Sequence, residues 1–302
     1  MAHTEEDFRE ILNAESFVDR EALAAAAKDG VPAAVRAEAW KYLLSVSKPD
    51  RSQELSAERD RKNQDYLRQD KHNVDILQRV RGELRRSTVR RDARDPERGA
   101  LLSSADNLKI FENITVAFLN GNEHVDYHDG LVHMLCPFMS CGLSDEAGLF
   151  HCFQSLMQRM EQKLRGAGIR QYAAKFITLF RELLPELHEH FEVEELGFEA
   201  WCIPWLRFLL SKELPLPAVV RLWDTYFALF FDTQQSDASI DALLDFHMYA
   251  CLAVLEPLQE EISQLERGEI KGVLSRLPAM DMDEVITKAS YMQQEINQRG
   301  LF

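Results

Sequence analysis

The sequence predicts an all-α fold. Apolar residues recur at the three- and four-residue spacing of a helix face in one segment after another, whereas alternating runs bounded by hairpin turns are nearly absent. Hydrophobic residues make up 46% of the 302-residue chain, which is ample for a buried core. The clearest helical faces comprise Leu149, Phe153, Leu156, Met157 and Met160; Phe176, Ile177, Phe180, Leu184 and Leu187; and Phe246, Tyr249, Leu252 and Leu255.

Local signals indicate where several of these helices begin and end. Ser144 is followed by two acids and predicts an N-cap, because acidic side chains favour the positive end of a helix. Gly121 is expected near a helix C-cap. The two prolines within residues 213–217 block a helix and predict a bend before Ala218. Three polar stretches lack a hydrophobic period and predict loops: residues 87–106, 191–198 and 232–241.

Charge and cysteine usage exclude several classes of protein. Fifty acidic and 35 basic residues give a net charge of -15, which argues against a surface for nucleic acid or anionic lipid. Five cysteines scattered through apolar segments are typical of reduced thiols in a cytoplasmic protein. No basic-then-apolar leader is visible, and the most apolar run, residues 243–258, contains charged side chains. We therefore expect no secretory signal and no transmembrane segment.

Motifs of the common catalytic classes are missing. The sequence contains no phosphate-binding loop, no nucleophile elbow and no dinucleotide-binding glycine pattern. Potential zinc ligands lie in apolar helical sequence without paired Cys-x-x-Cys spacing, which disfavours a zinc site. These residues are His133, Cys136, Cys141, His151 and Cys152. We expect neither a metal nor a cofactor belonging to this chain.

Three short blocks carry a resemblance to a known family. They are Gly30-Val31-Pro32-Ala33-Ala34-Val35-Arg36 running to Trp40, Tyr127-His128-Asp129-Gly130, and Arg221-Leu222-Trp223-Asp224. In that order, and with helical sequence between them, they resemble the TBC domain, a helical module that accelerates GTP hydrolysis on Rab-type small GTPases. The resemblance implies one domain over residues 1–302. Its N-terminal lobe (about 1–165) and C-terminal lobe (about 166–302) are expected to share a groove for the GTPase.

The outer two blocks are expected to support the fold rather than contact a substrate. Tryptophans usually pack in protein cores. The acid beside the second tryptophan, Asp224, is expected to cap a helix or to pair with Arg221 or Arg36. The expected scaffold residues are Arg36, Trp40, Arg221, Trp223 and Asp224.

A further segment resembles the family's catalytic-arginine motif. Val80-Arg81-Gly82-Glu83-Leu84-Arg85-Arg86-Ser87 is similar to the pattern Ile-x-x-Asp-x-x-Arg-Thr. The resemblance implies that Arg86 enters the GTPase site in trans, where such a guanidinium is worth about 10³ to 10⁵ in rate. Glu83 lies one helical turn earlier and is expected to steer it. Arg85 is the alternative if the register shifts by one. A solvated basic loop remains a second interpretation, because residues 79–98 contain eight arginines and four acids.

The central block departs from the family pattern Tyr-x-Gln-Gly at Asp129. In the family, that glutamine accepts a hydrogen bond from the attacking water and donates one to the phosphoryl oxygens. An ionised aspartate has no donor, and at about 4 Å and an effective dielectric near 20 its repulsion from a phosphate charge is about 4 kcal/mol. Tyr127 and Gly130 are expected to bind the GTPase or to support Arg86, the candidate arginine finger. Alternatively, Asp129 caps a helix that begins near Gly130.

The resemblance therefore implies an activator of a GTP-bound Rab GTPase in vesicle trafficking. It would act in trans rather than as an enzyme of its own, and GTP and Mg²⁺ would belong to the partner. We expect a cytoplasmic protein that reaches endomembranes only indirectly, through that partner. The alternative is a catalytically weak or inactive TBC domain that serves as a Rab-binding scaffold or complex subunit.

Overall fold

The computed structural model of the chain describes residues 3–51, 55–89, 95–143, 145–231 and 238–300. Over these residues every regular element is a helix, apart from one isolated bridge between Phe17 and Asp50, so the all-α prediction is confirmed. The first nine helices are α1 (Glu5–Leu12), α2 (Arg20–Ala27), α3 (Ala33–Leu43), α4 (Leu55–Leu67), α5 (Val74–Val89), α6 (Pro96–Ser103), α7 (Ala105–Gly121), α8 (Gly130–Ser140) and α9 (Glu146–Leu164).

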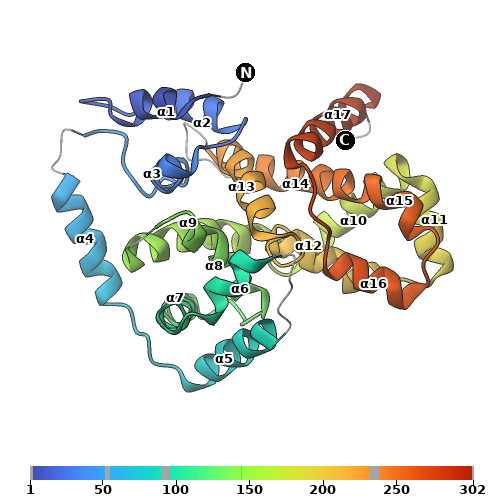
Figure 1. Ribbon diagram of the computed structural model, residues 1–302, viewed down its shortest axis with the longest axis horizontal. Coiled ribbons are helices and arrows are strands. Elements are labelled where there is room, and N and C mark those ends of the chain that lie inside the picture. The colour runs from blue at the N-terminus through green and yellow to red at the C-terminus, as the bar shows by residue number, and fades with distance from the viewer. Residues whose placement is uncertain (1–2, 52–54, 90–94, 144, 232–237, 301–302) are drawn as a thin grey trace.

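The second half of the chain is also helical. Its elements are α10 (Ala167–Leu183), α11 (Pro185–Val193), the 3-10 turn Phe198–Ala200, α12 (Cys202–Phe208), α13 (Leu216–Phe230), α14 (Ala238–Leu255), the 3-10 turn Glu256–Leu258, α15 (Gln259–Ile262), α16 (Arg267–Ser275) and α17 (Met282–Arg299). Figure 1 shows α4 to α9 on one side of the molecule and α10, α11 and α14 to α17 on the other. None of the described helices has the length and apolar character that a bilayer crossing requires.

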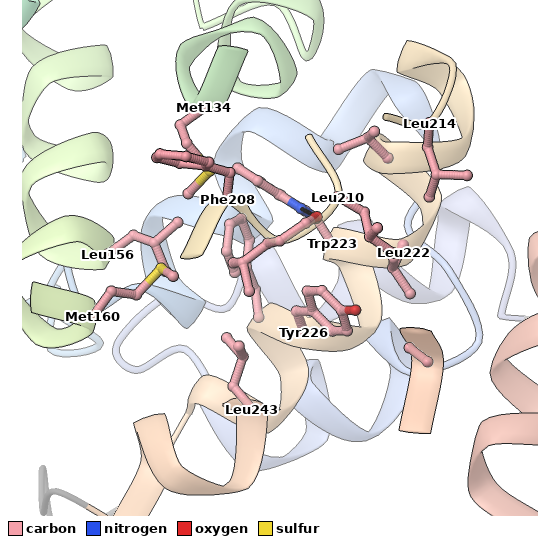
Figure 2. Close-up of a cluster of buried hydrophobic side chains, with 14 of the residues drawn as sticks. Met134, Leu156, Met160, Phe208, Leu210, Leu214, Leu222, Trp223, Tyr226 and Leu243 are labelled. Carbon is pink, nitrogen blue, oxygen red and sulfur yellow. Dashed lines mark hydrogen bonds between the residues drawn. The ribbon is translucent and has the colours of Figure 1, made fainter. Parts of the chain in front are cut away.

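Helix α8 lies in the middle of the core. Its residues from Gly130 to Phe138 are all buried, because α6, α7, α9, α12 and α13 pack around it. Figure 2 shows the adjoining cluster, in which Met134 of α8, Leu156 of α9 and Trp223 of α13 lie close together. Burial of this many large apolar side chains is the main stabilising term of such a domain. The N-terminal end of α8 is thereby fixed in place.

A buried acid ties the first turns of the chain to α13. Asp224 is fully buried and accepts hydrogen bonds from the Val31 amide at 2.9 Å, Trp40 Nε1 at 2.8 Å and Arg36 Nε at 3.1 Å. Burial raises the pKa of its carboxyl group, and the Arg36 guanidinium opposes that rise. Of the two partners expected for Asp224, Arg36 is the one it contacts.

The other arginine of the scaffold set has a different partner. Arg221 binds Asp283 through Nε at 2.8 Å and also reaches the Lys28 carbonyl at 3.3 Å. Its side chain lies against Gly30, whose φ of +106° suits glycine and where a Cβ would come within 3.1 Å of Arg221 Nε. Trp223 Nε1 donates to the Leu209 carbonyl at 3.3 Å. The contact with Lys28 holds the turn before α3 against α13, whereas the contacts with Asp283 and Leu209 tie α13 to α17 and to the segment after α12.

Three of the expected boundaries need correction. The face expected to run from Phe176 to Leu187 belongs to two helices, because Pro185 cannot donate a backbone hydrogen bond and starts α11. The expected loop 87–106 contains the end of α5 and the whole of α6, whose N-cap Asp95 accepts from the Arg98 amide at 3.2 Å. Helix α11 continues to Val193, inside the stretch 191–198.

The remaining local expectations have mixed outcomes. Helix α7 ends at Gly121, as expected, whereas α13 already begins at Leu216, between the two prolines, with Pro215 as its N-cap and Pro217 in its first turn. Helix α9 has Asp145 as its N-cap, which accepts from the Gly148 amide, and Ser144 lies outside the described residues. In the expected loop 232–241, α14 begins at Ala238, while residues 232–237 lie outside the described part.

Candidate functional site

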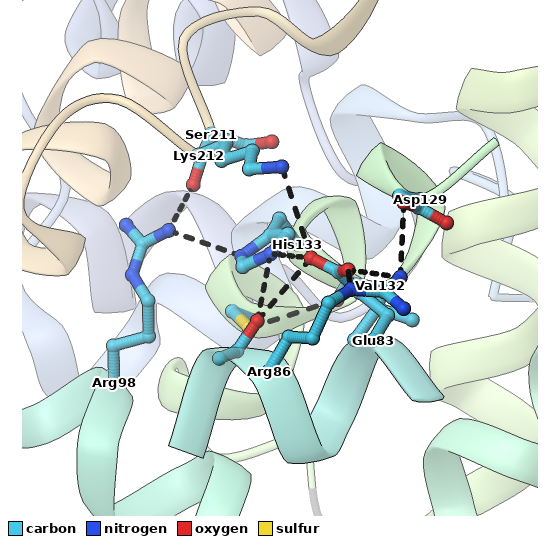
Figure 3. A network of polar contacts seen from close by, with 10 residues as sticks. Glu83, Arg86, Arg98, Asp129, Val132, His133, Ser211 and Lys212 are labelled. Carbon is cyan, nitrogen blue, oxygen red and sulfur yellow. Dashed lines mark hydrogen bonds and ion pairs between the residues drawn. The ribbon is translucent and has the colours of Figure 1, made fainter. Parts of the chain in front are cut away.

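Two residues from separate sequence motifs meet at the surface. Arg86 lies near the end of α5, and Asp129 immediately precedes α8. Arg86 Nη2 donates to Asp129 Oδ2 at 3.0 Å, and each side chain is 52% exposed. Figure 3 shows the guanidinium between Asp129 and Glu83. The packing of α5 beside α8 therefore brings together residues that are 43 positions apart in the sequence.

Glu83 holds the guanidinium from the protein side. Its Oε2 accepts from Arg86 Nε at 3.1 Å and from Nη2 at 2.8 Å, while the residue itself is only 4% exposed. Burial alone would raise the pKa of Glu83, but the His133 hydrogen bond and the Lys212 charge lower it to about 2. The carboxylate is thus ionised at neutral pH. Two contacts to one oxygen fix the plane of the Arg86 guanidinium.

Asp129 does not act as a helix cap. It occupies the N-cap position of α8, yet its backbone is helical, with φ of -56° and ψ of -29°, and its side chain makes no cap hydrogen bond. The carboxylate instead binds Arg86. The capping interpretation of this residue is therefore wrong, since the side chain turns toward the guanidinium.

The neighbours of Asp129 are fixed by packing. A Cβ on Gly130 would lie 2.5 Å from the Phe208 ring, so no larger residue fits without displacing that ring. The Tyr127 hydroxyl is buried and has no hydrogen-bond partner within the described part of the chain, and burial raises its pKa. Arg79 lies over the Tyr127 ring at 5.9 Å. This arrangement presents Tyr127 and Asp129 on the same side of the molecule as Arg86.

Arg85 is exposed one position before Arg86. Successive residues of an α-helix are rotated by about 100°, so the two arginines leave α5 in different directions. Arg86 is the one that reaches Asp129 and Glu83.

Sequence reasoning missed the residues behind Glu83. His133 Nε2 lies 3.1 Å from Glu83 Oε1, and Lys212 Nζ lies 3.7 Å from the same oxygen. Arg98 Nη1 lies 3.5 Å from His133 Nδ1. His133 was considered only as a zinc ligand, and Arg98 fell in an expected loop. The Asp95-Pro96 pair, a helix-start signal, could have placed Arg98 on a helix.

A cavity of about 250 Å³ adjoins this cluster and is bounded in part by Arg86, Arg98, His133, Lys212 and Glu213. Glu213 is 7% exposed, and its Oε2 has no hydrogen-bond partner among the residues that the structure describes. Burial raises the pKa of this carboxyl group to about 7. No group of three or more His, Cys, Asp or Glu side chains among the described residues is arranged to hold a metal ion.

The raised pKa of Glu213 predicts a pH-dependent stability. Its ordinary value is 4.5, so the folded state holds this proton more tightly than the unfolded state. The free energy of unfolding should therefore fall as pH rises from about 4.5 to about 7, by about 3 kcal/mol. Glu213→Gln should remove that slope in urea unfolding measured between pH 5 and 8. Parallel pH profiles for the wild-type and variant proteins would contradict the prediction.

Comparison with known proteins identifies relatives that match most of the sequence. The family model of the Rab-GTPase-TBC domain matches residues 33–263. TBC1 domain family member 22B of Homo sapiens is 24% identical over 305 residues, covering 90% of this chain and 56% of that protein. GTPase-activating protein gyp1 of Schizosaccharomyces pombe is 23% identical over 301 residues, covering 91% of this chain and 57% of that protein. The chain thus spans little more than half the length of these relatives.

Solved structures show the same fold. The Ypt/Rab-GAP domain of Gyp1p superposes with a TM-score of 0.78 at 18% identity, covering 96% of this chain and 98% of that one. The Chlamydomonas flagellar RabGAP TBC domain superposes with a TM-score of 0.54 at 16% identity, covering 90% and 80%. With the family match over most of the sequence, these findings show that the chain belongs to the Rab-GTPase-TBC domain family.

Proposed function

We propose that this chain is a GTPase-activating protein for a GTP-bound Rab-type GTPase and that Arg86 is its catalytic arginine. The observation that carries this proposal is the placement of Arg86. The guanidinium is half exposed, stands on a helix packed into the core, and is held by a buried carboxylate. The chain belongs to the Rab-GTPase-TBC domain family, and one of its relatives is named a GTPase-activating protein, which supports the same function. The chain would act in the cytoplasm and reach endomembranes through its partner.

The geometry suits stabilisation of a phosphoryl-transfer transition state. Glu83 occupies the Nε side of the guanidinium and fixes its plane, so the group needs little reorganisation when it meets the nucleotide. The guanidinium is permanently charged and offers several donors to phosphate oxygens. GTP and Mg²⁺ would come with the partner, and Arg86 would neutralise the charge that develops on the transferring group.

We further propose that Asp129 stands where the family pattern carries its glutamine. In the free domain its carboxylate binds the Arg86 Nη2 that phosphate oxygens would need. Aspartate also lacks the donor that a glutamine amide supplies. The domain would therefore depend on the GTPase's own glutamine to orient the attacking water.

The same ion pair supports a second candidate function, a catalytically weak or inactive domain that serves as a Rab-binding scaffold or complex subunit. Asp129 partly neutralises Arg86 before any phosphate arrives, and its charge repels the nucleotide. A domain of this kind would bind its GTPase without accelerating hydrolysis.

A panel of GTP-loaded Rab proteins, assayed for phosphate release with and without the domain, separates the two functions. Stimulated release that Arg86→Ala abolishes supports the activator. Binding without stimulated release supports the scaffold. The matched control is Arg81→Ala, which removes another exposed arginine of α5, one that pairs with Glu112.

Asp129→Gln is expected to raise stimulated hydrolysis at least tenfold. The change removes a negative charge beside the phosphates and restores a donor, and a tenfold rise requires only about 1.4 kcal/mol of the repulsion. The variant should also tolerate loss of the GTPase's own glutamine, whereas the wild-type domain should not. Asp126→Asn is the matched control, because it removes a nearby exposed acid. An unchanged rate in Asp129→Gln would refute a catalytic effect of this position.

A further inference from the structure

A buried chain of hydrogen bonds lies behind the Arg86 guanidinium. Glu83, His133 and Arg98 are 4%, 4% and 7% exposed. They are linked in that order by contacts of 3.1 Å between Glu83 Oε1 and His133 Nε2 and of 3.5 Å between His133 Nδ1 and Arg98 Nη1. In Figure 3 the side chains follow one another from Glu83 on α5 through His133 to Arg98, which contacts Ser211. Neither the family motif for the arginine nor the block around Asp129 contains His133 or Arg98.

The donor and acceptor groups of Glu83, His133 and Arg98 fix the direction of the hydrogen bonds between them. Burial, with the nearby Arg98 charge, lowers the pKa of His133 to about 4, so the ring is neutral at physiological pH. Arg98 can only donate, and the Glu83 carboxylate can only accept. His133 therefore accepts at Nδ1 and donates from Nε2–H, which is the one tautomer that satisfies both neighbours.

At its Arg98 end, this series of hydrogen bonds is anchored to the segment before α13. Arg98 donates to the Ser211 carbonyl and, at 2.5 Å, to the Leu214 carbonyl. Its Nε donates to Asp95 at 2.7 Å, and Asp95 in turn accepts from the Leu216 amide at 3.0 Å. Glu83 Oε1 is thus contacted by His133 Nε2 of α8 at 3.1 Å and also accepts from Ser87 Oγ of α5 at 3.3 Å. Exposed Lys212 adds only a longer contact.

We propose that His133 and Arg98 are positioning residues for Arg86. They fix the Glu83 carboxylate, whose Oε2 holds both Nε and Nη2 of the guanidinium, so that the charged group projects toward the face that carries Tyr127 and Asp129. Without the His133 donor, Glu83 Oε1 keeps only the longer contacts of Ser87 Oγ at 3.3 Å and Lys212 Nζ at 3.7 Å, and Arg86 samples other rotamers. The consequence for catalysis rests on the function proposed above, but the ordering of Arg86 does not.

The first test needs no GTPase. His133→Met removes the donor at similar side-chain volume, and His133→Gln keeps an amide donor for Glu83. In the free domain, the order parameter of the Arg86 Nε–H group, measured by nitrogen relaxation, should fall in His133→Met and stay near the wild-type value in His133→Gln. His247→Met is the matched control, because His247 is also fully buried and bonds elsewhere, to Tyr226 and the Trp205 carbonyl. All proteins are compared at a temperature where each is folded.

An unchanged Arg86 order parameter in His133→Met, or an equal fall in His247→Met, would overturn the proposal. The second readout is single-turnover hydrolysis at saturating domain. His133→Met should lower that rate about tenfold while the Kd for the GTPase changes less than twofold. In an Arg86→Ala background the same change should have no further effect.

The two proposals can fail separately. If Arg86→Ala leaves hydrolysis unchanged, the catalytic assignment fails while the order parameters still test the positioning role. If Arg86→Ala abolishes hydrolysis and His133→Met retains the full saturated rate, the positioning role fails and the catalytic assignment stands.

Discussion

Arg86→Ala is expected to lower stimulated GTP hydrolysis about 10³- to 10⁵-fold, the range that a trans-acting arginine contributes. Arg86→Lys should lose nearly as much, because an ammonium group cannot contact Glu83 and phosphate oxygens with the same planar set of donors. The thermal midpoint should change little, since the Arg86 side chain is half exposed and Glu83 keeps its His133 partner. Phosphate release and thermal unfolding, measured on the same preparations, check both parts.

The neighbouring arginines serve as controls for this result. Arg81→Ala should retain wild-type stimulation, because its side chain binds Glu112 at 2.7 Å and not the site. A loss in Arg85→Ala combined with full activity in Arg86→Ala would show that the motif register is wrong by one. Full activity in both would eliminate the arginine mechanism.

Asp224→Ala is expected to cost about 3 to 5 kcal/mol of stability, the range for removing one partner of a buried ion pair. The carboxylate is fully buried, and its loss would leave the Val31 amide, the Trp40 indole and the Arg36 Nε group without this acceptor. Because domains of this kind are stable by only about 5 to 15 kcal/mol, the variant should unfold at a much lower urea concentration.

The ion pair between Arg221 and Asp283 provides a control for the stability loss expected of Asp224→Ala. Asp283→Ala removes the partner of Arg221, but Asp283 is 71% exposed, so this change should cost at most about 1 kcal/mol. Asp224→Asn should be intermediate, because an amide oxygen can still accept from one or two of the donors. Equal losses in Asp224→Ala and Asp283→Ala would contradict the structural role of the buried acid.

The helical fold could be predicted because its signal is repeated and local. Long helices such as α9 and α10 have an apolar face of their own, and competing strand patterns are nearly absent from the sequence. The predicted helix boundaries were wrong where a single residue determines whether a helix ends or begins. Pro185 divides an apolar face that continues in register across two helices. The buried residues of helix α6 are only Arg98 and Leu102. Its short sequence therefore lacks the repeated spacing of apolar residues by which a helix is predicted.

The candidate site was predictable only in part. Motif resemblance singled out Glu83, Arg86 and Asp129, because a motif fixes which residue types stand at which spacing. It could not show that Asp129 binds Arg86, since that contact depends on how α5 packs beside α8. His133 lies 50 positions from Glu83, and its role depends on a neutral ring held between two charged groups. Such pairings arise from tertiary packing and leave no local pattern in the sequence.

The central claim, that Arg86 stabilises the transition state of a bound GTPase, is tested most directly with a transition-state analogue. The measurement is the affinity of the domain for a Rab GTPase loaded with GDP, with and without aluminium fluoride, which mimics the transferring phosphoryl group. A transition-state stabiliser should bind the fluoride complex at least about 100-fold more tightly, and Arg86→Ala should remove that gain. Equal affinity for the two nucleotide states, or a gain that persists in Arg86→Ala, would contradict the claim.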